Sequence, residues 1–283
     1  MRKINLRSIY AVSKKEFKDN IRNYWIVALI SIFFLLTLLT SFFVGGQGEN
    51  SAVFGGFEET VATLLSIGSA LVPIIAIMLG YATISGEVES GSLDLVLSYP
   101  LRRVELLLGK MIGLSGVVGL STVVGFGLGG VLIAFFAGAA SWTGYLTFIM
   151  LTILLGVLYL SVSTFFSTLT SKRSTSLGIA IVIFFWGMIY GTLILGIFLA
   201  QGHSMADLLQ GEAFPEWLWR TLVLSPQDMY QAGAMLAFDV EEAFGLPLDL
   251  PGFINLRFLV SVQLLWTIIP LILSFYVFKK KDL

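Results

Sequence analysis

The sequence predicts an all-α, polytopic membrane protein with six transmembrane helices. Of its 283 residues, 57% are hydrophobic and only 12% are charged, whereas an ordinary soluble domain is roughly 25% charged. A bilayer core about 30 Å thick needs roughly 20 consecutive apolar residues of helix. Six runs of about that length contain no charged residue and no histidine, at 25–44, 61–84, 111–136, 145–170, 177–200 and 258–278.

The distribution of basic residues predicts how the chain is oriented. All but two of the 17 Lys and Arg residues fall in the N-terminal arm, the loop at 85–110, the turn at 171–176 and the C-terminal tail. Acidic residues gather in the other loops, chiefly in the segment at 201–256. Cytoplasmic loops are enriched in Lys and Arg. We therefore expect a multi-pass protein of the cell membrane, forming one domain over 1–283, with both termini in the cytoplasm.

The arm at 1–24 is predicted to form a helix in the inner membrane interface. Leu6, Tyr10 and Phe17 recur with helical spacing, and Lys14 and Lys18 fall on another face. The arm is either a basic anchor whose long side chains reach toward the lipid head groups, or an elbow that braces the bundle. Both alternatives place it on the membrane, so its basic charge does not indicate a nucleic-acid partner.

The loop at 86–105 contains a short predicted helix. Ser90-Gly91-Ser92 is a helix-start signal, Asp94 suits the first turn of a helix, and Pro100 ends the run. These signals predict a helix from about Leu93 to Tyr99, on the cytoplasmic side of the membrane.

One face of this short helix is apolar. Leu93, Val96 and Leu97 share it, at spacings i, i+3 and i+4. Such a knob either fills a groove on another protein or packs back on the helix ends of its own chain, and the spacing leaves both possibilities open. The polar side chains that flank the knob are Glu87, Glu89, Arg102 and Arg103.

The outer segment at 201–256 is too long for a simple turn and too apolar in places for a linker. Trp217 and Trp219 stand where an aromatic belt would place them at the outer interface. We expect short helices that dip into this surface or lie on it. They would either cover the bundle as a lid or bind a partner.

Several classes of function lack their signature in this sequence. The chain has no cysteine and one histidine, His203, so it offers no thiol-based or multi-histidine metal site of its own. It has no histidine near a nucleophile and no G-x-x-x-x-G-K-[ST] motif, so we expect no catalytic activity and no bound cofactor. The uncharged spans disfavour a proton-coupled or ion-coupled carrier. Hydroxyls within the fourth span would line a path or join helices, at Ser161, Ser163, Thr164 and Ser167.

The stretch SGEVESGSLDLVLSYPLRRVELLLGK, at 85–110, resembles the signature of the ABC-2 family of transporter permeases. That signature reads E-x-E-x-G-[ST]-L-[DE]-x-[LV]-L-[ST]-x-P-x-[SR]-R and precedes a G-K pair at the third span. The matching residues are Glu87, Glu89, Gly91, Ser92, Leu93, Asp94, Leu97, Ser98, Pro100, Arg103, Gly109 and Lys110. The start of the chain is similar to the family's K-E-[FL]-x-[DE]-x-x-R-[NS] pattern, through Lys15, Glu16, Phe17, Asp19, Arg22 and Asn23.

The resemblance implies a homodimeric or paired permease that works with two cytoplasmic ATPase subunits, which bind the ATP. The short helix at 93–99 would be a coupling helix that enters a groove on the ATPase. The implied contact consists of Leu93, Val96 and Leu97, rimmed by Glu87, Glu89, Arg102 and Arg103. A secondary carrier that is not ion-coupled, a membrane scaffold, and a module that only transmits mechanical work to an outer partner remain as alternatives.

Within the family, LSPQDMYQAGAML at 224–236 is similar to the N-P-x-D-x-Y-R segment of NosY-type permeases, although Ser225 and Gln231 depart from it. Permeases of that type belong to a transporter that supports copper-site maturation of nitrous oxide reductase. The resemblance implies a periplasmic or extracellular accessory protein seated on the outer segment. The implied contact residues are Trp217, Trp219, Gln227, Asp228 and Tyr230.

Overall fold

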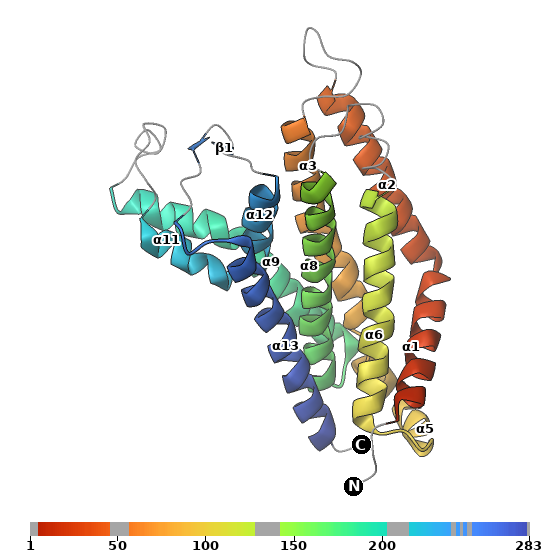
Figure 1. The fold of residues 1–283 in the computed structure, drawn as a ribbon. Coiled ribbons are helices and arrows are strands. Elements are labelled where there is room, and N and C mark those ends of the chain that lie inside the picture. The colour runs from red at the N-terminus through yellow and green to blue at the C-terminus, as the bar shows by residue number, and fades with distance from the viewer. Residues whose placement is uncertain are drawn as a thin grey trace.

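A computed structural model describes residues 5–45, 57–127, 142–202, 215–238, 242–243, 246–247 and 251–281. Long helices stand side by side in one bundle, and shorter helices project sideways near one end of it (Figure 1). The start of α1 (Leu6–Ile21) and the end of α13 (Leu256–Lys280) lie at the opposite end. We call this opposite end the terminal end, and the projecting helices, which span 216–237, the side arm.

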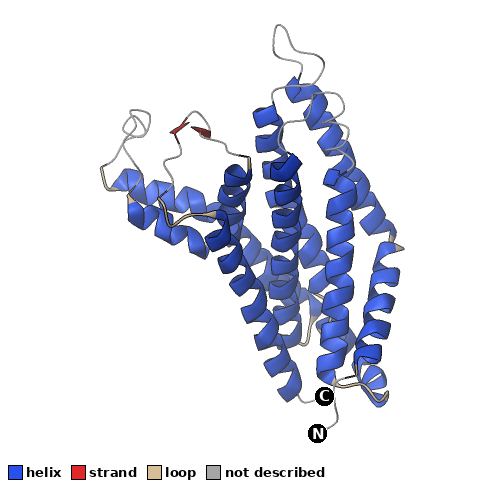
Figure 2. Ribbon diagram, viewed as in Figure 1, coloured by secondary structure: helices blue, strands red, loops and turns tan. Residues whose placement is uncertain are grey.

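The other elements follow in chain order. They are α2 (Tyr24–Gly45), α3 (Phe57–Gly80), α4 (Ser85–Glu89), α5 (Ser92–Ser98), α6 (Arg103–Thr122), the π-helical turn η1 (Val123–Gly127), α8 (Trp142–Leu169), α9 (Arg173–Ala200), α11 (Glu216–Thr221), the 3-10 turn η2 (Leu222–Leu224), α12 (Pro226–Ala237), β1 (Glu242–Ala243) and β2 (Leu246–Pro247). The two strands pair antiparallel. Apart from this ladder of two residues per strand, the regular structure of the described residues is helical, as predicted (Figure 2).

Five helices in the described part of the chain are long and apolar enough to cross a membrane. They cover 64–89, 103–127, 142–169, 173–200 and 256–280, and so correspond to the second through sixth predicted spans. The first predicted span, 25–44, coincides with α2, a helix of 22 residues, several of whose side chains lie outside the described set. At a rise of about 1.5 Å per residue α2 is long enough to cross a bilayer core. The total of six spans stays a prediction.

Helix α8 lies at the centre of the bundle. It contacts α3, α6, α9, α12 and α13, and its middle is buried, including Leu155, Leu158 and Tyr159. In contrast, most of the surface of α9 and α13 is exposed and apolar. A helix that is apolar on its outer face suits a lipid environment, which fits the membrane location that the sequence predicts.

Three hydroxyls of α8 join it to its neighbours. Ser161 donates to the Thr267 carbonyl at 2.6 Å, and Ser163 donates to the Ile77 carbonyl at 3.2 Å. Ser167 Oγ accepts the backbone N–H groups of Ile84 and Ser85 at 2.9 and 3.0 Å. Buried hydroxyls that bridge helices in this way favour the joining role over a path-lining role.

The arm helix α1 packs along α6. A Cβ atom added at Gly109 would lie 2.6 Å from Val12 Cβ, and one added at Gly113 would lie 2.6 Å from the Ser13 carbonyl oxygen. The two glycines therefore let the helix backbones approach closely, as small residues four apart do. Of the two alternatives for the arm, this packing supports the elbow that braces the bundle.

Candidate functional site

The charged segment at 85–110 forms the tip of the terminal end. Helix α5 turns away from the bundle beside the start of α1 (Figure 1). Gly91 makes the turn between α4 and α5 with a φ of +69°, a left-handed conformation that costs a glycine little. The predicted helix at about 93–99 is confirmed, since α5 spans Ser92–Ser98.

The apolar face of α5 points into the chain rather than away from it. Leu93 is only 1% exposed and packs with Ile84, Leu106, Leu107 and Phe278. Val96 and Leu97 are partly buried against the same cluster. Of the two possibilities left open by the spacing, the knob packs on the helix ends of its own chain. In this conformation Leu93 is not available to a partner.

Two other apolar side chains of the segment point outward. Leu95 is 68% exposed and Tyr99 is 63% exposed. Leu95 lies within α5 and Tyr99 is its C-cap residue, four positions on, and Asp94 and Ser98 beside them are exposed too. The sequence did not lead us to predict this pair, because the apolar face of Leu93, Val96 and Leu97 contains more apolar residues. The i, i+4 spacing of Leu95 and Tyr99 was the signal that could have revealed it.

A buried lysine ties the segment to two other helices. Lys110 is only 4% exposed, and its Nζ lies 2.9 Å from Glu16 Oε1 on α1 and 2.8 Å from Glu87 Oε1 on α4. Two carboxylates thus surround one ammonium, and each makes a charge-assisted hydrogen bond to it. Glu87 therefore bonds within the chain instead of standing free at a rim.

A second ion pair joins α4 to α9. Arg173 Nε donates to Glu89 Oε2 at 2.9 Å, and the backbone N–H of Arg173 donates to the same oxygen at 3.0 Å. Arg173 is the first residue of α9, so this carboxylate sits at a helix N-terminus, where negative charge is favoured. Both side chains are partly exposed, which makes this contact weaker than the buried one.

Arg103 also bonds inward through its side chain, whereas Arg102 does so only through its backbone N–H. Arg103 Nη1 donates to the carbonyls of Phe278 and Lys281, at 2.9 and 2.7 Å, at the end of α13. The backbone N–H of Arg102 donates to Glu105 Oε2 at 3.0 Å, at the start of α6. A cation at a helix C-terminus satisfies carbonyls that have no partner within the helix. The side chains of Glu87, Glu89 and Arg103 thus bond to α6, α9 and α13, respectively.

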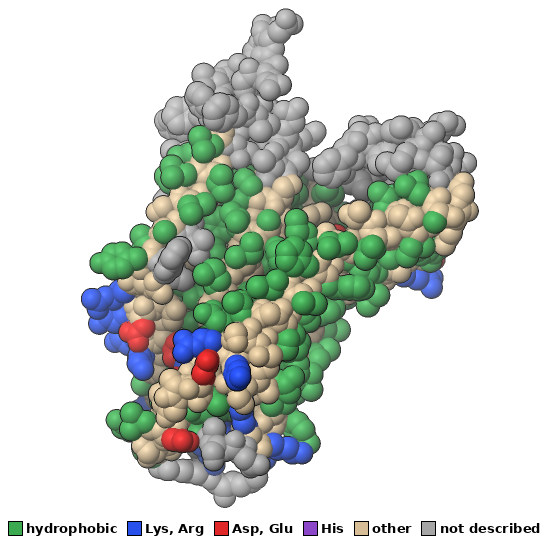
Figure 3. All heavy atoms as spheres, turned by 180° about the vertical axis from the view of Figure 1, so that it is seen from behind, with side chains coloured by type: hydrophobic (Ala, Val, Ile, Leu, Met, Phe, Trp, Pro, Cys, Tyr) green, Lys and Arg blue, Asp and Glu red, His purple; other side chains and the backbone are tan. Residues whose placement is uncertain are grey.

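Charged and hydrophobic side chains occupy different parts of the molecular surface. In the view of Figure 3, most of the visible Lys, Arg, Asp and Glu side chains gather toward the terminal end, and a broad hydrophobic surface covers the bundle above them. The segment at 85–110 is therefore a charged, rigidly held tip that presents one small apolar patch, Leu95 with Tyr99. Such a patch with a polar surround has the composition of a small protein-binding surface.

The five predicted contact residues of the outer segment lie in or beside the side arm. Gln227 and Tyr230 are buried: Gln227 Nε2 donates to the Ser69 carbonyl at 2.9 Å, and the Tyr230 hydroxyl lies 3.0 Å from Thr152 Oγ1. Trp219 is buried as well. In this conformation these three residues hold α11 and α12 on the bundle, and a partner would not reach them. Trp217 is partly exposed.

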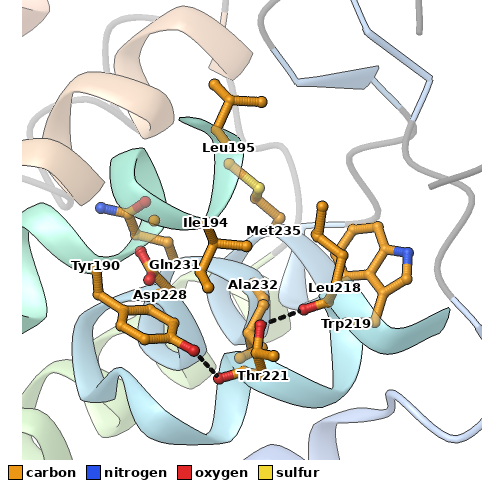
Figure 4. A pocket seen from close by; sticks show the side chains of 12 residues that line it. Tyr190, Ile194, Leu195, Leu218, Trp219, Thr221, Asp228, Gln231, Ala232 and Met235 are labelled. Atoms are coloured by element: carbon orange, nitrogen blue, oxygen red, sulfur yellow. Dashed lines mark hydrogen bonds between the residues drawn. The ribbon is translucent and has the colours of Figure 1, made fainter. Parts of the chain in front are cut away.

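Asp228 lines a cavity of about 250 Å³ between α9 and the side arm (Figure 4). Burial raises the pKa of its carboxyl, and a hydrogen bond with Ser225 partly offsets this effect. Within the described residues, no three His, Cys, Asp or Glu side chains come together in a way that could hold a metal ion. His203 lies outside the described residues.

Comparison with known proteins gives the same family as the sequence motif. The family model described as "ABC-2 family transporter protein" matches residues 10–283. A "Probable ABC transporter permease protein NosY" of Pseudomonas aeruginosa is 33% identical over 272 residues, which cover 93% of this chain and 92% of the relative. The protein of the same name from Stutzerimonas stutzeri is 29% identical over 285 residues, which cover 98% of this chain and 99% of that relative.

Proposed function

The chain belongs to the ABC-2 family of transporter proteins as a permease subunit, and we propose that its segment at 85–110 receives mechanical work from a cytoplasmic ATPase. The observation that carries this proposal is the contrast within the segment. Its polar residues are bonded to four helices of the bundle, while Leu95 and Tyr99 remain exposed at the tip. This arrangement suits a contact that must pass on a displacement without deforming.

In this proposal Leu95 and Tyr99 fill the groove of the ATPase, with the half-buried Val96 and Leu97 at its edge. Leu93 supports the helix from inside. Glu87, Glu89 and Arg103 transmit the motion instead of forming a rim, because each is bonded to a different part of the bundle. Apolar anchors at the centre of a contact carry most of its binding energy.

ATP binding and release on the partner would then bias the bundle between two arrangements. A rigid-body movement of α4 and α5 would pass to α9 through Arg173 and to α1 and α6 through Lys110, and then from α6 to α13 through Arg103. Switching by rigid elements at an interface is a common mode of conformational change. The chain has no phosphate-binding G-x-x-x-x-G-K-[ST] motif, so ATP hydrolysis belongs to the partner and this subunit is not catalytic.

The proposed coupling to an ATPase also implies a second permease subunit and an orientation in the membrane. A second permease, in a homodimer or a mixed pair, would complete the transporter, and the termini would face the cytoplasm beside the ATPases. The similarity to NosY permeases further suggests that the work reaches an extracytoplasmic protein seated on the outer segment, in copper-site assembly of nitrous oxide reductase. Of the predicted outer contacts, the partly exposed Trp217 is then the first candidate.

Copurification tests the coupling proposal directly. The tagged chain is expressed with its genomic neighbours, purified in mild detergent, and the bound proteins are identified. We expect an ATPase subunit near a one-to-one ratio, lost with Leu95→Asp and Tyr99→Asp. Leu169→Asp is the matched control, because Leu169 is 52% exposed at the end of α8 but lies outside α5. ATPase binding that survives both α5 variants, or that is lost equally in the control, contradicts the assignment.

A further inference from the structure

The cavity beside Asp228 has apolar walls and one carboxylate. Its apolar lining includes Ile194 and Leu195 from α9, Leu218 from α11, and Ala232 and Met235 from α12. Figure 4 shows Tyr190, Asp228 and Gln231 at one side of this lining and Trp219 at the other. The volume of about 250 Å³ is just below the roughly 300–1,000 Å³ of typical ligand pockets. A small molecule therefore suits it better than a large one.

The carboxylate of Asp228 lies against the backbone of α9. A Cβ atom at Gly191 would lie 3.0 Å from Asp228 Oδ1, so the glycine leaves room for the carboxylate at the cavity wall. None of the ion pairs among the described residues includes Asp228. A half-buried anion without a cationic partner is unfavourable. A bound cation would remove that cost.

Three other polar side chains of the lining make hydrogen bonds within the chain. The Tyr190 hydroxyl donates to the Thr221 carbonyl at 2.9 Å, and Thr221 Oγ1 donates to the Leu218 carbonyl at 2.7 Å. Gln231 Nε2 lies 3.5 Å from Ser69 Oγ. Asp228 is thus the strongest polar group that the cavity offers to a ligand, and it attracts positive charge.

Two buried polar atoms lie just inward of this wall. The Tyr159 hydroxyl and Gln227 Oε1 have no hydrogen-bond partner in the described structure. Both face Gly187, one helical turn from Gly191: a Cβ atom at Gly187 would lie 2.6 Å from the hydroxyl and 3.0 Å from the amide oxygen. Buried polar atoms normally have partners. These two atoms lie behind the cavity wall and are not part of its lining, so within the lining Asp228 marks the side for the polar end of a ligand.

We propose that this cavity binds a small amphipathic cation: an organic ammonium group paired with Asp228, on an apolar body that lies along Ile194, Leu218 and Met235. A purely apolar ligand would leave the carboxylate unpaired, and an anion would be repelled by it. The face of Tyr190 adds a cation–π contact for the ammonium. This site goes beyond the coupling function and does not depend on it, because binding needs no ATPase. The ammonium could come from a free amine or from a lipid of the ethanolamine type.

Binding is tested on the full chain, purified with its bound partners, in nanodiscs of phosphatidylglycerol. The probe is cyclohexylmethylammonium, and its neutral isostere cyclohexylmethanol is the matched ligand. Saturable binding is read from the unfolding midpoint and from tryptophan fluorescence, since Trp219 lines the cavity. We expect the ammonium but not the alcohol to raise the midpoint. Asp228→Asn should weaken the affinity for the ammonium probe by about tenfold or more, because hydrogen bonds between charged groups are stronger than neutral ones.

Two further variants distinguish binding in the cavity from an effect of losing any carboxylate of the side arm. Glu216→Gln removes an exposed carboxylate of the same arm that pairs with Arg220 and lies outside the cavity lining, so it should leave binding unchanged. Ala232→Leu fills the cavity and should abolish binding while Asp228 remains. Equal binding of the ammonium by the wild type and Asp228→Asn, or equal binding of the alcohol and the ammonium, overturns the proposal.

The lipid composition identifies the source of the ammonium. Adding phosphatidylethanolamine to the nanodisc provides an ammonium head group on an apolar body. Competition with the probe, lost in Asp228→Asn, assigns the site to a lipid head group. Binding that is unchanged by this lipid assigns it to a free amine. Absence of saturable probe binding in both lipid compositions overturns the proposal.

Discussion

The two ends of the bundle are fastened by different chemistry. At the terminal end, charged groups join the helices: Lys110 of α6 lies between carboxylates of α1 and α4, Glu89 of α4 pairs with Arg173 of α9, and Arg103 of α6 bonds to carbonyls of α13. At the other end, neutral hydrogen bonds of Gln227 and Tyr230 hold α12, together with apolar packing.

This difference fits the proposed function, in which the terminal end passes on motion and the side arm only packs on the bundle. Charged groups that are removed from water bind only their complementary partners, and a missing partner is costly. Neutral hydrogen bonds cost less free energy to break. The cavity lies beside the helix that they hold, α12. The contrast predicts an order of effects for single substitutions.

The largest effect is expected at Lys110. Replacing it by Met leaves Glu16 and Glu87 facing each other without their cation, so the free energy of unfolding should fall by about 3–5 kcal/mol, as when one partner of a buried pair is removed. Thermal unfolding in detergent measures the loss. Lys14→Met is the matched control, because Lys14 is an exposed lysine on α1. If both variants lose the same stability, the buried lysine does not fasten this end.

Tyr230→Phe should have a smaller effect at the other end. The change removes one hydroxyl, and Thr152 keeps its bond to the Phe148 carbonyl at 2.7 Å. A neutral hydrogen bond contributes about 0.5–1.5 kcal/mol, so we expect a loss in that range by the same unfolding measurement. A loss as large as that of Lys110→Met would remove the proposed contrast between the two ends.

The exposed pair of Glu89 and Arg173 should contribute least to stability, yet matter for coupling. A double-mutant cycle with Glu89→Gln and Arg173→Gln should give a coupling energy of about 0.2–1 kcal/mol. We expect ATP-driven activity of the assembled transporter to fall more than this stability change explains. Activity that stays at the wild-type level in both variants would show that α9 does not receive motion through this pair.

The pH dependence at Asp228 sharpens the comparison further. Burial raises the pKa of its carboxyl above the ordinary value of 3.8, so the folded state holds this proton more tightly than the unfolded state. The carboxylate therefore destabilises the fold increasingly as the pH rises above 3.8, up to its folded pKa. Asp228→Asn should be more stable than the wild type at neutral pH, and the gap should close as the pH falls. A gap that does not change with pH contradicts this assignment.

Much of the architecture could be predicted because it depends on local pattern. Uncharged runs located the spans, and Gly91 with Pro100 located α5 to within a residue. The direction in which α5 faces could not be predicted, because periodicity identifies an apolar face but not the neighbour that covers it. Leu93 is covered by Phe278, which lies near the other end of the sequence.

The same limit applies to the polar groups. Lys110 and Glu16 are 94 residues apart, so their ion pair was invisible to spacing, although each residue belonged to a recognisable motif. No sequence pattern indicated the cavity beside Asp228, because three helices that are separate in the sequence form it. Burial of Gln227 and Tyr230 was equally hidden, because a polar residue in an outer segment is normally exposed.

The hydroxyl of Ser167 fixes the break between α3 and α4, at 81–84, to the central helix α8. The backbone N–H groups of Ile84 and Ser85 bond to this one oxygen on α8, so the start of α4 is fixed to the central helix at this point, while Glu87 and Glu89 fix the rest of α4 to α6 and α9. The tip, with Leu95, lies on one side of that point, and the body of α3 lies on the other. Under the proposed coupling, a push at the tip would reach α8 directly through this oxygen, besides passing along the chain to α3.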